Sequence, residues 1–205
     1  MNQWRGNESV LQRAFVKVWD LLILNLCFLA CCVPVITAGA GLTALFSVNL
    51  KAVRREEGGI FTEYWKAFRS NFRQATALWL ILLLLGGILL ADFLALRLVT
   101  GPVRFVLKVM LGMGLAVYLA VFPWIFGYTA RFVDRTGTVL KNALLLSIAE
   151  LPLSGAMLAM AVVPVVLSFY SVEMFLRILF VWVVLGFALI NYCQCILLRR
   201  AFDKL

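Results

Sequence analysis

The stretch PVITAGAGLTALF, residues 34–46, interrupts an apolar run that covers residues 18–50. It places a proline, two threonines and two glycines where a membrane helix would otherwise continue. Pro34 removes a backbone donor from the helix, and glycines let neighbouring backbones approach closely. We therefore predict a tight turn at 34–41 between two short helical legs. The residues that define this turn are Pro34, Thr37, Gly39 and Gly41.

The composition sets the class of protein. Of the 205 residues, 64% are hydrophobic and only 14% are charged, which is far too apolar for a soluble domain. Runs almost free of charge recur, each near or above the roughly 17–25 residues that span the hydrocarbon layer as a helix. No period-two alternation is present, which argues against a membrane β-barrel. The sequence therefore predicts an all-α, polytopic membrane protein. The runs cover residues 21–50, 74–91, 109–130, 142–172 and 178–198.

The distribution of the basic residues predicts the topology. The net charge is +9, but membrane proteins collect Lys and Arg on cytoplasmic loops, so we expect no nucleic-acid partner. If 18–50 crosses the membrane twice, fifteen cations lie on one side and four on the other. A single crossing would remove this bias. The bias favours six helices with both termini in the cytoplasm. The four minority cations are Arg97, Arg104, Lys108 and Arg177.

The lengths of the first two legs leave their geometry open. At 1.5 Å per residue, 18–33 reaches about 24 Å and 38–50 about 20 Å, so both legs are short. A full hairpin and a re-entrant hairpin satisfy the same charge count, and a single kinked helix is the less favoured alternative. We expect one membrane domain, 1–205. Its three hairpins are 18–50, 74–130 and 142–198.

The basic segment 51–73 carries an amphipathic pattern. Aromatic residues recur on one side of a helix over 60–73, and cations occupy the other side. This is the layout of an interfacial helix that lies along the cytoplasmic membrane surface. Asn71 falls within the aromatic stripe, and its amide therefore needs a partner in the protein. The predicted docking residues of this helix are Tyr64, Trp65, Phe68, Asn71 and Phe72.

Polar residues inside apolar segments are the default places to look for function. Glu150 lies about 13 Å beyond Lys141 along a helix and precedes Pro152. A carboxylate at that depth has to be protonated, hydrated or paired. Two interpretations stay open: a proton- or ligand-linked site, or a side chain that satisfies hydrogen bonds at the proline break. The candidate intramembrane polar residues are Glu150, Asp20, Asn25 and Asn191, and Asn49 is a further helix bridge.

The chemistry of common active sites is scarce in this sequence. The chain has no histidine, which removes the commonest metal ligand and general base. Its five cysteines lie in apolar segments without a paired CxxC spacing. No phosphate-binding loop and no nucleophile elbow occurs. We therefore expect no enzyme activity, no metal and no cofactor.

Residues 34–75, with WDLLILNLCFLACCV before them at 19–33, resemble the bacterial YesL family of small integral membrane proteins of unknown function. The later LKNALLLSIAELP, at 140–152, is similar as well. The residues that carry the resemblance are Pro34, Thr37, Gly39, Ala44, Leu45, Glu56, Glu57, Gly58, Phe68, Asn71, Phe72, Gln74 and Ala75.

What the resemblance implies about function comes from the genes that neighbour the members of the family. Members of the family are encoded beside carbohydrate ABC importers, two-component regulators and glycoside hydrolases. We therefore expect a non-enzymatic protein of the bacterial cytoplasmic membrane, an accessory or regulatory partner in carbohydrate uptake. Its partners would be the lipid bilayer, an ABC permease or sensor kinase, or a second copy of itself. The alternatives are a small solute transporter or channel in its own right, and a membrane scaffold.

Overall fold

The computed structural model describes residues 10–54, 56, 58–169, 175 and 179–204. Regular structure in this part of the chain is entirely helical. Six of its helices are long and apolar enough to cross a membrane, judged by length and composition. The expected polytopic helical fold is therefore confirmed. The six candidate spans are Phe15–Cys32, Val35–Val53, Ile60–Ala95, Pro102–Arg131, Leu151–Ser168 and Leu179–Phe202.

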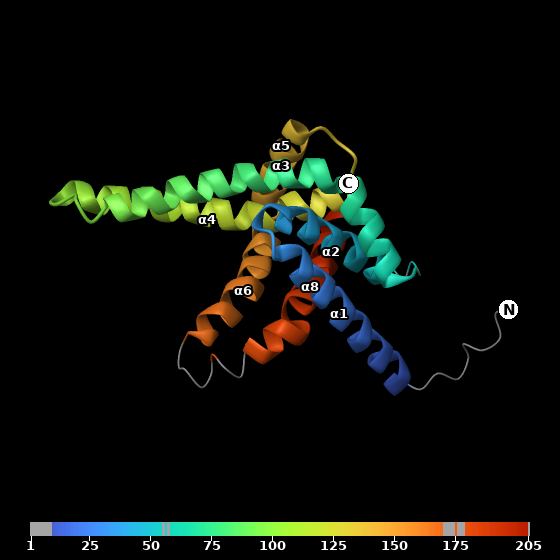
Figure 1. Ribbon diagram of the computed structural model, residues 1–205. Helices are drawn as coiled ribbons and strands as arrows, with labels where there is room; N and C mark the ends of the chain where they lie inside the picture. Colours follow the sequence, from blue (N-terminus) through green and yellow to red (C-terminus); the bar gives the residue numbers. More distant parts are fainter. Residues whose placement is uncertain (1–9, 55, 57, 170–174, 176–178, 205) are drawn as a thin grey trace.

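The helices follow one another with short connections, and Figure 1 shows their arrangement. In chain order they are α1 (Val10–Cys32), the 3-10 turn η1 (Val35–Thr37), α2 (Ala38–Val53), α3 (Ile60–Ala95), α4 (Pro102–Arg131), α5 (Thr136–Ala149), α6 (Leu151–Ser168), the π-helical turn η2 (Trp182–Gly186) and α8 (Phe187–Phe202).

The turn between α1 and α2 is fastened by two side chains. The hydroxyl of Thr37 donates to the carbonyl of Cys31 (2.6 Å) and to that of Pro34 (2.9 Å). The bond to Cys31 satisfies a carbonyl that the end of α1 leaves without a helical partner. From α3, the indole of Trp79 donates to the carbonyl of Val35 (2.8 Å).

The interruption is thus a turn between two helices and not a kink within one, but it is shorter than predicted. It covers residues 33–37, and Gly39 and Gly41, which were predicted as turn residues, lie in the first turn of α2 and serve its packing instead.

Helix α2 is the centre of the molecule. Every residue from Gly39 to Leu50 except Leu42 is buried, and α1, α3, α4 and α8 all pack against this helix. A Cβ at position 39 would lie 2.4 Å from Cβ of Trp79 and 2.8 Å from the carbonyl oxygen of Ala75. Only glycine therefore allows α2 to approach α3 this closely, as small residues do between membrane helices.

Helix α3 differs from the sequence expectation because it runs without a break from Ile60 to Ala95. The predicted interfacial helix 60–73 is its first part and not a separate element. The connecting stretch RQATAL contains no helix breaker, and good helix formers favour continuation. One face stays buried along both parts, so the packing also continues. Its buried residues are Tyr64, Ala67, Ala75, Leu78 and Leu82.

The outer halves of α3 and α4 lie side by side and extend beyond the other helices (Figure 1). We call this pair of half-helices, residues 83–117, the arm. Most of its side chains are exposed, as expected for surfaces that face lipid. Where the arm leaves the bundle, the hydroxyl of Tyr118 donates to the carbonyl of Leu82 (3.2 Å).

The third expected hairpin, 142–198, is divided in its first leg. Helix α5 ends at Ala149, Glu150 has non-helical dihedrals, and α6 starts at Leu151. Pro152 falls in the first turn of α6. Backbone N–H groups in a first turn have no acceptor within the helix, so the N–H that proline lacks costs no helical hydrogen bond. The hydroxyl of Ser154 donates to the carbonyl of Ser147 (2.9 Å) across the break. Because α5 is too short to span a membrane, α6 is the candidate span of this leg.

Candidate functional site

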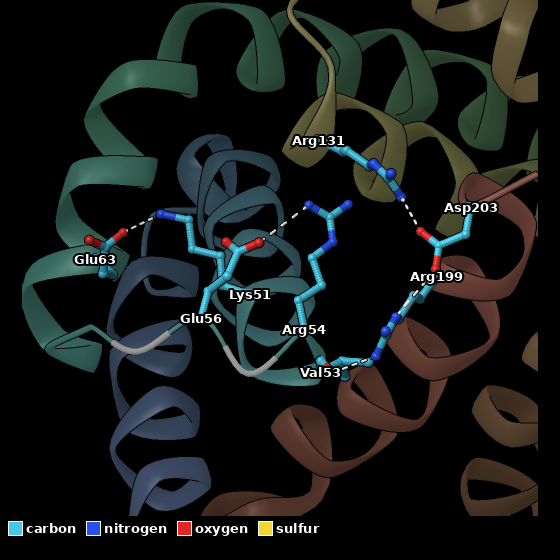
Figure 2. A network of polar contacts seen from close by, with 8 residues as sticks. All are labelled: Lys51, Val53, Arg54, Glu56, Glu63, Arg131, Arg199 and Asp203. Carbon is cyan, nitrogen blue, oxygen red and sulfur yellow. Dashed lines mark hydrogen bonds and ion pairs between the residues drawn. The ribbon is translucent and has the colours of Figure 1, made fainter. Parts of the chain in front are cut away.

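The ends of α2, α4 and α8 and the start of α3 meet in a network of ion pairs (Figure 2). Lys51 forms an ion pair with Glu63, and Arg54 forms one with Glu56, in which Nη1 of the arginine lies 3.7 Å from Oε1 of the glutamate. We call this region the basic end. Four cations that are distant in sequence are thereby brought to one end of the molecule: Lys51, Arg54, Arg131 and Arg199. These cations come from the second, third and fourth basic clusters of the sequence, which lie on one side whether 18–50 crosses the membrane once or twice, so the choice between these topologies stays a prediction.

Helices α4 and α8 are joined at the basic end through one carboxylate. Asp203 pairs with Arg131 (3.5 Å) and with Arg199 (3.3 Å). Arg199 also donates to the carbonyl of Val53 at the end of α2 (2.8 Å), as Figure 2 shows. Arg199 and Asp203 together therefore tie the end of α8 to the last turns of α2 and α4.

Glu150 lies at the same end, close to the end of the chain. Its carboxylate accepts a bond from the ammonium of Lys204 (2.7 Å), so this acid is paired. Of the two interpretations left open by the sequence, this geometry fits the structural one. Asp20 is half-buried on α1, ahead of Asn25 in the chain.

Asn25 is the most fully satisfied of the predicted intramembrane polar residues. Its side chain is 0% exposed, and its amide donates to the carbonyls of Trp182 (3.0 Å) and Val183 (2.7 Å). Its carbonyl oxygen accepts from the backbone N–H of Ala188 (3.0 Å). A π-helical turn widens the backbone and disturbs the ordinary ladder of hydrogen bonds. Asn25 on α1 supplies bonds that η2 and α8 would otherwise lack.

Asn49 and Asn191 form a second buried contact beside it. The amide of Asn49 donates to the side-chain oxygen of Asn191 (2.8 Å) and to the carbonyl of Ala188 (3.3 Å). The oxygen of Asn49 and the amide nitrogen of Asn191 remain without partners in the described part of the chain. We call Asn25, Asn49 and Asn191 the asparagine cluster; it joins α1, α2 and α8 in the interior.

A cavity of about 380 Å³ lies between α1, α2, α4, α6 and α8. Its volume falls in the range of about 300–1,000 Å³ that is typical of small-molecule sites. The walls are mainly apolar, and Asn191 and Gln194 contribute the amides. The amide of Gln194 is engaged, because it donates to the carbonyl of Met157 (3.2 Å). The side chain of Asn191 thus carries the unpaired polar group of this wall.

The predicted docking residues of α3 separate into two groups. Three of them, Trp65, Phe68 and Phe72, continue a row of edge-to-face contacts that begins at Phe61, which was not among the predicted residues. The ring centroids along this row are 6.2, 5.3 and 5.4 Å apart. We call these four residues the aromatic row. Tyr64 instead faces inward, where its hydroxyl donates to the carbonyl of Gly41 (3.2 Å). The wheel pattern missed this, because Tyr64 packs against α2.

Two amides near the aromatic row make contacts of different kinds. Asn71 donates to the carbonyl of Ala67 in its own helix (3.0 Å), so its partner is local. Gln74 donates to the carbonyl of Asp134 in the connection between α4 and α5 (2.6 Å). Sequence reasoning missed the role of Gln74, although this glutamine is among the residues that carry the family resemblance.

A polar contact on α4 and α5 was also missed. The hydroxyl of Tyr128 donates to the carboxylate of Asp134 (2.6 Å) and accepts from the amide of Asn142 (2.9 Å).

Within the described residues, no group of three or more His, Cys, Asp or Glu side chains could hold a metal ion.

Fold and site together define a polytopic helical membrane protein with a cluster of amides in its interior. Residues 21–93 match the model of a family described as a protein of unknown function, DUF624. The matched stretch contains the turn between α1 and α2, all of α2 and nearly all of α3. The match is consistent with a YesL-like family of unknown function. No curated protein and no solved structure matches the chain.

Proposed function

We propose that this chain is a non-enzymatic integral membrane protein that acts as an accessory or regulatory partner of an ABC-type carbohydrate uptake system. The type of system comes from the YesL resemblance. The basic end would face the cytoplasm of the bacterial cell, in line with the positive-inside rule. Energy coupling would come from the partner, because the sequence carries no phosphate-binding loop.

The aromatic row is the observation that carries the proposal. Phe61 and Phe72 at its two ends are 59% and 39% exposed, and the neighbouring cations of α3 are exposed as well. Aromatic and arginine side chains are enriched at the energetic centres of protein interfaces. The row lies beside the basic end, where a cytoplasmic or interfacial segment of a permease or sensor kinase could contact it. The cations are Lys66, Arg69 and Arg73.

The test is an affinity purification from native membranes in mild detergent, read by mass spectrometry. We expect a permease or a sensor kinase in near-stoichiometric amount with the native chain. Replacing Phe61 and Phe72 together by Ala should abolish its recovery, since both rings are exposed and their loss leaves the core intact. The matched control replaces Phe105 and Phe169, which are exposed elsewhere. Recovery that survives the first pair, or no partner at all, would contradict the proposal.

The transport alternative is favoured by a different observation, the cavity next to the asparagine cluster. The unpaired amide of Asn191 in its wall could orient a solute. If the protein transports a solute by itself, reconstituted vesicles should show flux that Asn191→Leu removes. Glu150→Gln should then leave the flux intact, because Glu150 pairs with Lys204 outside the cavity. An absence of flux together with a recovered partner would favour the accessory function.

A further inference from the structure

Three cations gather at the far end of the arm. Arg97 lies in the turn after α3, and Arg104 and Lys108 lie one helical turn apart near the start of α4. All three line a groove of about 380 Å³, which we call the tip groove. Its apolar lining consists of Phe93, Leu96, Leu111, Gly112 and Leu115.

The charge in the tip groove is uncompensated. Among the described residues, none of the three cations forms an ion pair, whereas the basic end contains several. Asp92 on α3 is the neighbouring acid, and a single carboxylate would still leave two positive charges. Like charges four residues apart on a helix, as Arg104 and Lys108 are, destabilise that helix. The groove would therefore be stabilised by an anion.

The length of α4 matches the thickness of a bilayer with its headgroups. Arg104 and Arg131 stand near the two ends of α4, about 40 Å apart at 1.5 Å per residue. A bilayer with its headgroups is about 40–45 Å thick. If the basic end lies at one headgroup layer, the tip groove reaches the opposite one.

We propose that the tip groove binds an anionic phospholipid. Its phosphate would contact the guanidinium groups of Arg97 and Arg104 and the ammonium of Lys108, in the charge-assisted bonds that phosphates form with these groups. The acyl chains would lie along the leucines that continue the groove. A free phosphate ion would contact the cations of the groove but not its apolar lining. A phospholipid contacts both, the cations through its phosphate and the apolar lining through its acyl chains.

The experiment uses the purified full chain, exchanged into an equimolar mixture of phosphatidylglycerol and phosphatidylcholine and read by native mass spectrometry. We expect the native chain to retain phosphatidylglycerol. Replacing Arg97, Arg104 and Lys108 by Gln should lower that preference at least about tenfold, which equals a loss of about 1.4 kcal/mol. The matched control replaces Arg135, Lys141 and Arg200 by Gln; these three cations are exposed, and their loss removes the same charge outside the arm. An equal loss in both variants, or equal retention of both lipids by the native chain, would overturn the proposal.

A second pair of variants separates a lipid from a free anion. Gly112 lines the tip groove, and a Cβ built there meets nothing within 4 Å, so Gly112→Phe fills the groove while the cations remain. We expect this variant to lose phosphatidylglycerol retention, and Gly87→Phe, at an equally open site of the arm, to keep it. Added inorganic phosphate should not displace the lipid from the native chain. Unchanged retention in Gly112→Phe, or displacement by phosphate, would assign the groove to a headgroup-sized ion and refute the lipid.

Discussion

Helix α2 and the arm invert the usual relation between hydrophobicity and burial. Among the six candidate spans α2 is the least apolar, yet it is the most buried, while the strongly apolar α3 and α4 expose most of their outer halves. In a membrane, apolar side chains gain little by leaving lipid, so helices associate through close packing of small residues and through polar contacts. The glycines and the asparagine of α2 therefore mark the interior, and the leucines of the arm mark the surface.

The largest expected contrast comes from one substitution made in both regions. Phe46 in α2 is 1% exposed, and Phe105 on the arm is 71% exposed. Phe46→Ala should lower the free energy of unfolding by about 3–5 kcal/mol, because it opens a cavity in a closed core. Phe105→Ala should change it by less than about 0.5 kcal/mol. SDS titration in mixed micelles, followed by circular dichroism, measures both. Equal losses would mean that the arm is packed as firmly as α2.

The next contrast concerns glycines. Gly39→Ala should destabilise the protein near the upper end of the about 1–3 kcal/mol typical of overpacking, since the new methyl meets Cβ of Trp79 and a backbone oxygen. Gly87→Ala on the arm meets nothing within 4 Å and should stabilise its helix by about 0.5–1 kcal/mol. Thermal unfolding of the two variants in one detergent gives the comparison. A neutral Gly39→Ala would show that α2 and α3 can separate without loss.

A smaller effect should separate an amide that joins different helices in the interior from an amide that is bonded only within its own helix. Asn25→Leu removes three hydrogen bonds to η2 and α8, and bonds between membrane helices average about 0.6 kcal/mol each, so we expect a loss of about 2 kcal/mol. Asn71→Leu removes bonds within its own helix and should cost less than about 0.5 kcal/mol. The SDS titration described above measures the free energy of unfolding of both variants. If both variants behave alike, the π-helical turn does not depend on Asn25.

The smallest effect is expected at Glu150. Its partner Lys204 is 65% exposed, and pairs of this kind contribute about 0–1 kcal/mol. Glu150→Gln should therefore lower the melting temperature slightly, and raising the NaCl concentration should reduce the difference from the native chain. A large loss that is independent of salt would mean that the carboxylate does more than pair with Lys204.

The sequence was sufficient for the features that depend on composition and on proline. The six spans and the existence of a turn after Cys32 follow from apolar length and from the chemistry of proline, although the turn ends at Thr37 and not at Gly41. The continuity of α3 was not foreseen, because an amphipathic pattern over 60–73 does not show where a helix ends. Its inner face, with Tyr64 at its start, becomes visible only once α2 is placed against it.

The candidate site was predicted as a set of residues but not as a geometry. Asn25, Asn49 and Asn191 were recognised as polar groups in apolar segments, yet their contacts join parts of the chain more than 130 residues apart. Glu150 was placed by counting along a single helix, and such a count does not show that the end of α5 lies beside Lys204 near the end of the chain. The π-helical turn has no sequence signal that we recognise.

The enclosure of α2 has a consequence for biosynthesis. The side-chain oxygen of Asn191 accepts a hydrogen bond from the amide of Asn49, and Sγ of Cys195 lies 3.8 Å from the carbonyl oxygen of Phe46. Helix α8 therefore covers one side of α2. Helix α2 leaves the ribosome second among the six candidate spans, and α8 leaves last. During the interval α2 has to reside at the insertion machinery or in lipid with Asn49 uncovered. A chain halted before Phe187 would therefore leave the amide of Asn49 without its two acceptors in α8, at the energetic cost of an unpaired polar group in an apolar environment.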